Sequence, residues 1–192
     1  MIALHPDVQQ KLHEEMDRVF GDDDTRPCTM EDLNELNYLE RVIKETLRLF
    51  PSVPFIGREV QEDFVHSKRP WSRSTLDRSL LPIADGYKIL RGTTAVLFIY
   101  FLHRDPKYFP DPDRFLPENS VGRAPCAYIP FSAGSRNCIG QRFAMLEEKV
   151  MLSSILRQFK IKTVQSAKEL HISFELILRS ETAALIQLER RH

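Results

Sequence analysis

The sequence predicts an α+β fold that is mainly helical and carries small β-sheets. Three runs place apolar residues at helical spacing: 6–20, 31–50 and 141–159. Short segments rich in β-branched and aromatic residues lie between and after these runs, as small strands would. The chain has 192 residues, which is enough for one domain with a hydrophobic core.

Composition excludes several classes of protein. Lys+Arg and Asp+Glu balance at 27 each, so net charge gives no reason to expect a nucleic-acid partner. The three cysteines, Cys28, Cys126 and Cys138, include no CxxC pair, which argues against a zinc site or a disulfide framework. No apolar run reaches roughly 18 residues, and the N-terminus lacks the apolar core of a signal peptide. We expect the chain to be part of a larger protein.

Two helices are predicted near the N-terminus. The first begins at Pro6, which suits a first helical turn, and ends at Gly21. Thr29 and Asp32 resemble a capping arrangement before a second helix, which spans about Glu31–Phe50 and is ended by Pro51 and Pro54. The expected buried faces consist of Val8, Leu12, Met16, Val19 and Phe20 in the first helix, and Leu33, Leu36, Leu39, Val42, Ile43, Thr46, Leu47 and Phe50 in the second.

The remaining elements are short. The predicted strands are 52–60, 86–90, 94–101, 161–164, 170–178 and 183–188. Arg91 and Gly92 form the turn before 94–101, which we expect to be buried, and 180–182 is a turn between the last two strands.

Residues 65–82 interrupt this pattern. The segment carries Lys68, Arg69, Arg73 and Arg78 but has neither helical nor strand periodicity. We therefore predict an inserted, disordered loop. Together with Trp71, its positive charge could instead contact an acidic partner or a lipid surface.

The segment Pro130–Gly140 carries the most informative cysteine. Cys138 comes just before the predicted helix 141–159, whose free N–H groups and dipole favour a thiolate. Arg136 adds a positive charge nearby, and Gly134 permits a tight turn. Such a cysteine could ligate iron, act as a nucleophile, or be an inert small hydrophobe.

The spacing Phe131-x-x-Gly134-x-Arg136-x-Cys138-x-Gly140 resembles the haem-binding signature of the cytochrome P450 family. This resemblance implies that the Cys138 thiolate is the proximal ligand of haem b, iron protoporphyrin IX. It also implies that Arg136 pairs with a haem propionate and that Phe131 packs against the porphyrin, with Gly134 and Gly140 completing the cofactor-binding loop.

Glu45 and Arg48 could simply form an i,i+3 surface ion pair. They also match the ExxR element of the same family, and Pro112-Asp113-Arg114-Phe115 resembles its P-E-R-F element. The resemblance therefore implies a structural triad of Glu45, Arg48 and Arg114, in which loss of one member leaves an unpaired charge.

Three further positions have two interpretations each. Arg58 lies on a strand from which the family's basic residue reaches a haem propionate, or it is a solvated edge residue. His103, in a stretch that resembles the family, is either a ligand, for which a single position cannot compete with Cys138, or, as we expect, a structural residue hydrogen-bonded to backbone or core. The third case is a set of basic residues on the predicted last helix. These residues either form a solvated face or provide a docking surface for an acidic electron donor.

That basic set consists of Arg142, Lys149 and Arg157. The helix is expected to bury Phe143, Leu146, Val150, Ile155 and Phe159 and to expose Arg142, Glu147, Glu148, Lys149 and Arg157.

The resemblance is strongest to the family 4 branch, in stretches such as RLFPSVP and FLHRDPKYF. It implies the C-terminal, proximal haem-side portion of a cytochrome P450 fold. The implied activity is O2-dependent hydroxylation of fatty acids or related lipids, with electrons from NADPH through a cytochrome P450 reductase. The implied location is the endoplasmic reticulum membrane, with the anchor outside this chain.

Two other functions stay open. The central helix that activates oxygen in this family is not in the sequence, so no catalytic residue is assigned, and the chain could be a non-catalytic truncated fragment or splice product. A cysteine-nucleophile enzyme is the weaker alternative, because no motif places a His–Asn or His–Asp pair beside Cys138.

Overall fold

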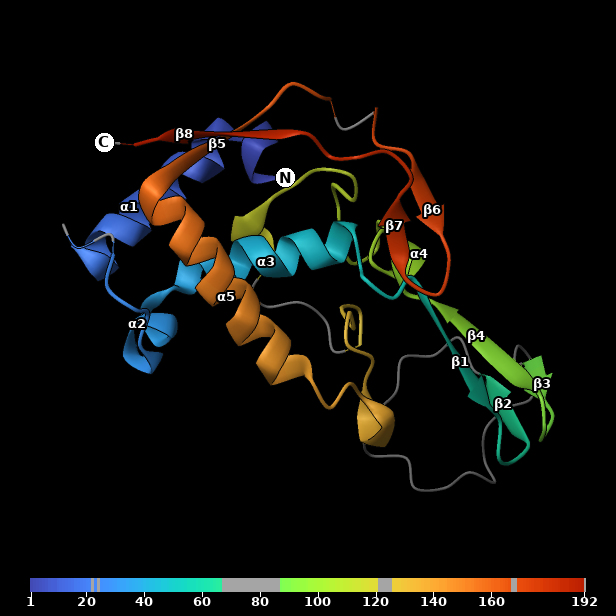
Figure 1. Cartoon of the computed structure of the whole chain (residues 1–192). Coiled ribbons are helices and arrows are strands. Elements are labelled where there is room, and N and C mark those ends of the chain that lie inside the picture. Colours follow the sequence, from blue (N-terminus) through green and yellow to red (C-terminus); the bar gives the residue numbers. More distant parts are fainter. Residues whose placement is uncertain (22, 24, 67–86, 121–125, 167–168, 192) are drawn as a thin grey trace. The chain divides into compact units, whose positions relative to one another are not determined.

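A computed structural model describes residues 1–21, 23, 25–66, 87–120, 126–166 and 169–191 of the chain. It forms two units, one made of residues 1–54 and 98–192 and the other of residues 55–97 (Figure 1). Both contain short strands, and the larger unit holds the helices. The mixed α+β prediction is confirmed.

The first long helix follows the prediction closely. A short 3-10 helix, Ile2–Leu4, precedes α1, which spans Pro6–Phe20. Pro6 occupies the first turn, and Gly21 ends the helix with a φ of 62°, a left-handed conformation that glycine adopts without strain. Its apolar face is buried in the main core.

The predicted helix 31–50 is in fact two helices, α2 at Met30–Glu35 and α3 at Asn37–Leu49. The break at Leu36 is stabilised from outside the segment. The buried carboxylate of Glu15 in α1 accepts hydrogen bonds from the backbone N–H groups of Tyr38 and Leu39 at 2.7 and 2.8 Å. Glu15 therefore caps the start of α3, whose own N-cap residue offers no side-chain cap.

The predicted cap of α2 is present. The Thr29 hydroxyl accepts from the Asp32 N–H at 3.3 Å, and the Asp32 carboxylate accepts from the Thr29 N–H at 2.8 Å. This reciprocal pair is a capping box. The guanidinium of Arg26 also donates to both oxygens of Asp32, at 2.6 and 2.8 Å. Arg26 and Thr29 therefore both bind the carboxylate of Asp32.

Helix α5 spans Gln141–Gln158, but it buries a different face from the predicted one. Lys149 and Arg157 are 6% and 5% exposed, whereas Phe143 is 70% exposed. Lys149 Nζ donates to Leu33 O at 2.9 Å and to a Glu40 carboxylate oxygen at 2.8 Å. The expected solvated or docking role is therefore wrong for Lys149 and Arg157.

Arg157 shows how a charged side chain is accommodated in this interface. Its Nη2 donates to Arg26 O at 2.9 Å, and its guanidinium lies 4.3 Å from the ring centroid of Phe20. Of the expected buried residues, Leu146 and Ile155 pack partly against the core, and Val150 is exposed.

A two-stranded ribbon follows α5. Strand β5, Phe159–Thr163, pairs antiparallel with β8, Ile186–Arg190 (Figure 1). The side-chain amide of Gln9 in α1 bonds to both backbone groups of Ile161, at 2.6 and 3.0 Å. Since Gln9 is buried, this contact fixes the ribbon against α1 and satisfies the outward backbone groups of Ile161.

The predicted strand 170–178 is a hairpin. Its two strands are β6, Ile172–Phe174, and β7, Leu178–Ser180, which pair antiparallel. The bend expected at 180–182 follows β7.

The predicted strand 94–101 is also split. It consists of β4, Thr94–Phe98, and a short helix α4, Ile99–Leu102. Apart from Ala95, the side chains of β4 are exposed, so the expectation of a buried strand is wrong.

In the smaller unit, β1 (Phe55–Glu59) pairs with β4, and β2 (Phe64–His66) pairs antiparallel with β3 (Tyr87–Ile89). The predicted turn at Arg91-Gly92 exists, but it joins two strands that pair with different partners. Of the predicted insertion 65–82, Val65 and His66 belong to β2, and 67–82 lie outside the described residues.

No helix in the described part of the chain combines the length and the hydrophobicity that crossing a membrane requires.

Candidate functional site

The loop before α5 is closed by its own backbone hydrogen bonds. Cys138 N–H donates to Phe131 O at 2.9 Å, and Asn137 N–H donates to Gly134 O at 3.2 Å. A 3-10 turn, Gly134–Arg136, lies between them, and α5 begins three residues after the cysteine. The prediction that Cys138 lies just before a helix is confirmed. Its side chain is exposed, so its sulfur is accessible from solvent.

The two glycines of the loop serve different purposes. Gly134 has a φ of 80°, which a residue with a Cβ rarely adopts. At Gly140 an added Cβ would lie 3.8 Å from Cys138 Sγ, an ordinary van der Waals separation. Gly134 is therefore required by backbone conformation, whereas Gly140 leaves the space beside the sulfur open.

The other predicted cofactor residues are found in two places. Phe131 is half-buried and packs partly against the core, and Arg136 is exposed in the 3-10 turn. Arg58 is half-buried on β1, where its Nη1 donates to Gly57 O at 2.9 Å. Arg58 belongs to the smaller unit, whereas the cysteine loop belongs to the larger one.

Glu45 and Arg48 form a fully buried pair on α3. Arg48 Nε and Nη2 donate to the two carboxylate oxygens of Glu45 at 3.1 and 2.9 Å, and both side chains are 2% exposed. The surface-pair interpretation is therefore wrong. Because both ions are removed from water, each depends on the other for its charge balance.

Arg48 also binds the irregular segment that leads toward the cysteine loop. Its Nη1 donates to His103 O at 3.0 Å and Pro112 O at 2.6 Å, and its Nη2 donates to Arg114 O at 2.8 Å. A Glu45 carboxylate oxygen accepts from the Leu116 N–H at 3.1 Å. One ion pair thus fixes four points of the backbone.

The role of Arg114 differs from the prediction. Its backbone carbonyl joins the Glu45–Arg48 pair, but its side chain is 70% exposed and its Nη1 lies 3.8 Å from Asp111 Oδ2. The Arg114 backbone meets the Glu45–Arg48 pair, but the guanidinium that we expected to complete the triad lies near Asp111 instead. The backbone turn that presents the carbonyl directs the side chain to solvent instead.

His103 has the structural role that we expected. It is fully buried, and its Nε2 accepts from the Ile129 N–H at 2.9 Å. Its ring stacks on Tyr128 with centroids 5.1 Å apart. The Tyr128 hydroxyl donates to Lys44 O at 2.9 Å. Tyr128 was missed from the sequence, where its only signal is an aromatic residue just before the loop.

The donor chemistry of this loop fits a haem iron. Iron protoporphyrin needs one strong protein ligand on its proximal side, and an exposed cysteine sulfur can supply it. In the described residues, no group of three or more His, Cys, Asp and Glu side chains could hold a metal ion. Cys28 is half-buried, and burial raises the pKa of its thiol, so it is a poorer thiolate donor.

Sequence comparison agrees with this chemistry. The cytochrome P450 family model matches residues 1–70 and 78–187. The chain belongs to the cytochrome P450 family. The internal gap in this match, residues 71–77, falls within the predicted insertion.

Similar P450s belong to the family 4 branch. The chain is 51% identical over 196 residues to cytochrome P450 4V2 of Pongo abelii and 50% identical over 197 residues to that of Homo sapiens. It is 44% identical over 197 residues to cytochrome P450 4c3 of Drosophila melanogaster. These alignments include the whole chain but 33–34% of each relative, so the chain spans about a third of their length.

Proposed function

We propose that this chain forms the proximal part of a haem-thiolate monooxygenase, with Cys138 as the axial ligand. The observation that carries the proposal is the exposed sulfur of Cys138, positioned ahead of α5 by the bond from Cys138 N–H to Phe131 O, in a chain of the cytochrome P450 family. When bound, the haem supplies the oxygen-activating chemistry.

The residues of this chain would bind and orient that group. The Cys138 thiolate would bind the iron, and Phe131 would pack against the porphyrin. Arg136 and Arg58 would pair with the propionates, while Gly134 allows the turn of the loop and Gly140 leaves space beside the sulfur. Glu45 and Arg48 act indirectly, because they hold the 112–116 backbone that leads into this region.

The substrate proposal rests on similarity to the family 4 branch. We propose hydroxylation of a fatty acid or a related lipid, with NADPH-derived electrons delivered by a cytochrome P450 reductase. The corresponding location is the endoplasmic reticulum membrane. Exposed Arg142, at the start of α5, is the one member of the expected donor-docking set that stays available for an acidic partner.

A non-catalytic role for this chain alone is supported by a separate observation. Large apolar side chains on α5 and just before it are open to solvent: Ile139 is 104% exposed, Phe143 70% and Met151 60%. Apolar surface of this kind is characteristic of an interface.

Haem binding provides the deciding experiment. The 192-residue chain is expressed, mixed with haem, reduced and exposed to carbon monoxide. We expect a red-shifted thiolate–CO band that is lost in Cys138→Ala and retained in Cys126→Ala, a matched control because both cysteines are exposed. A band that survives Cys138→Ala would contradict the ligand assignment.

Turnover separates the two functions. Lipid hydroxylation by this chain with a reductase would support the monooxygenase acting alone. A Cys138-dependent band without turnover would support a haem-binding portion whose activity needs further chain. Absence of both would favour the non-catalytic fragment.

A further inference from the structure

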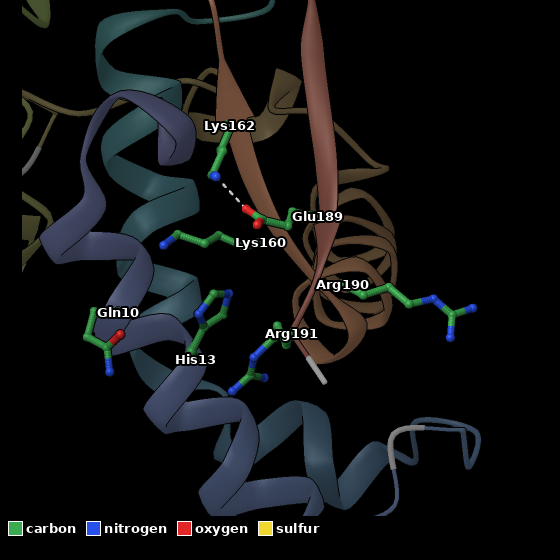
Figure 2. Close-up of a pocket in the computed structure, with 7 residues that line it drawn as sticks. All are labelled: Gln10, His13, Lys160, Lys162, Glu189, Arg190 and Arg191. Atoms are coloured by element: carbon green, nitrogen blue, oxygen red, sulfur yellow. Dashed lines mark ion pairs between the residues drawn. The ribbon is translucent and has the colours of Figure 1, made fainter.

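A pocket lies between α1 and the β5–β8 ribbon, within the larger unit. It has a volume of about 420 Å³, which is in the range of small-molecule sites (Figure 2). Its walls are formed by seven residues: Gln10, His13, Lys160, Lys162, Glu189, Arg190 and Arg191. None of them belongs to the cysteine loop, so the pocket needs its own explanation.

The cations of this pocket are only partly neutralised. Lys162 forms an ion pair with Glu189, and Arg191 donates to both carboxylate oxygens of Asp17 at 2.8 and 2.7 Å. Lys160 takes part in none of the ion pairs found among the described residues, although Glu189 lies opposite it in the β5–β8 register and feels its charge. In Figure 2 the Lys160 side chain extends across the space between α1 and β8, so its ammonium group faces the pocket.

His13 is the second group whose bonding is incomplete. It is 8% exposed, and its Nε2 is buried without a hydrogen-bond partner in the structure. Figure 2 shows its ring between the side chains of Lys160 and Arg191. A buried polar atom without a partner costs free energy, which a ligand at this position would recover.

The groups around His13 determine how it titrates. Desolvation by burial lowers its pKa most, followed by the positive charge of Arg191, and Lys160 acts in the same direction. The carbonyl of Phe159 and the carboxylate of Asp17 oppose these effects. An anion in the pocket would offset the two cations and the desolvation, and therefore favour the protonated ring.

We propose that this pocket binds a phosphate group, with Lys160 as its main ion-pair partner and His13 taking up a proton as the anion binds. A phosphate offers several strong acceptor oxygens and a charge near −2, so one group can satisfy Lys160 and share Arg191 with Asp17. The proton on His13 then places a further cation in the pocket wall. Binding should be tighter at pH 6 than at pH 8 for an anion whose own charge is constant.

Calorimetric titration of the 192-residue chain at fixed ionic strength tests the pocket, with inorganic phosphate as the probe. We expect Lys160→Gln to weaken binding about tenfold, the value of one charge-assisted hydrogen bond. Lys107→Gln removes the same charge from an exposed side chain elsewhere and should change nothing. Equal affinities for Lys160→Gln and Lys107→Gln would overturn the proposal.

Two further experiments ask whether the bound group is free phosphate or a lipid headgroup, and whether His13 takes up a proton. Lys160-dependent binding of inorganic phosphate supports a free phosphate, whereas Lys160-dependent binding only to vesicles containing phosphatidic acid supports a lipid headgroup. Sulfate, which stays a dianion, tests proton uptake: its affinity should rise from pH 8 to pH 6 in the native chain and not in His13→Asn. The same pH dependence in both would show that His13 does not take up the proton.

Discussion

The buried Glu45–Arg48 pair and the exposed cysteine loop are built on opposite principles. Arg48 uses its guanidinium in five hydrogen bonds, to Glu45 and to three backbone carbonyls, and its side chain is 2% exposed. The Cys138 loop is closed by short-range backbone bonds, and its cysteine side chain faces solvent. The pair serves structure, and the loop leaves one atom available for a ligand.

This difference predicts where a substitution costs stability and where it costs function. Removing one member of a saturated buried pair leaves the other charge without compensation. Removing an exposed atom that contacts little costs almost nothing until a ligand is present.

The largest effect is expected for Arg48→Ala. Glu45 would remain buried without its cation, so the free energy of unfolding should fall by about 3–5 kcal/mol. Urea unfolding of the variant measures it, with Arg41→Ala as the control on the exposed side of the same helix. A loss below about 1 kcal/mol would show that the pair is not essential to the fold.

A smaller effect is expected for Lys149→Met. Comparing it with Lys44→Met tests how burial changes the contribution of an ion pair, because both lysines pair with Glu40. Lys149 and Lys44 both pair with Glu40, at 2.8 and 2.6 Å, but their side chains are 8% and 40% exposed. We expect the free energy of unfolding to fall by about 1–3 kcal/mol for Lys149→Met. For exposed Lys44→Met it should fall by less than about 1 kcal/mol. Equal losses would mean that burial does not distinguish the two pairs.

Asp32→Asn tests a cap that the sequence predicted. Hydrogen bonds from Arg26, then from Thr29, hold the pKa of Asp32 well below its ordinary value of 3.8, despite burial. A lowered folded-state pKa stabilises the fold above the ordinary value, and this stabilisation is lost as pH falls toward the folded-state pKa.

We therefore expect the native chain to lose stability more steeply than Asp32→Asn below about pH 4, as measured by urea unfolding across pH. At pH 7 the variant should lose about 1–2 kcal/mol. Glu31→Gln, exposed in the same turn, is the control. If unfolding free energy fell equally with pH in Asp32→Asn and the native chain, the Asp32 carboxylate would not be the source of the acid sensitivity.

The smallest effect on stability is expected for Cys138→Ala without haem. Its exposed side chain should change unfolding free energy by less than about 0.5 kcal/mol, again by urea unfolding. Half-buried Cys28→Ala should cost more, because that side chain packs partly against the core. A larger loss for Cys138→Ala would mean that the sulfur has a structural role.

Local signals in the sequence predicted local structure well. The bounds of α1, the Thr29–Asp32 capping box and the position of Cys138 before α5 were all predicted from residue types at fixed spacing. These features depend on atoms within a few residues of one another, so the sequence alone was sufficient.

Features that depend on distant segments were not predictable in the same way. The break at Leu36 requires the Glu15 carboxylate from another helix, and the pairing of β3 with β2 rather than with β4 requires a third strand. The ordinary periodicity of 31–50 contains no sign of that cap.

The sequence by itself determined that α5 exists, that a cysteine precedes it, and that Glu45 and Arg48 share one helical face. Only the tertiary structure decided which side of α5 is buried and which atom of Arg114 meets Arg48. The physical reason is that helical spacing fixes which side chains neighbour one another, whereas burial depends on what lies opposite. Lys149 can be buried because the Glu40 carboxylate and Leu33 O accept hydrogen bonds from its ammonium group. Leu33 belongs to α2 and Glu40 to α3.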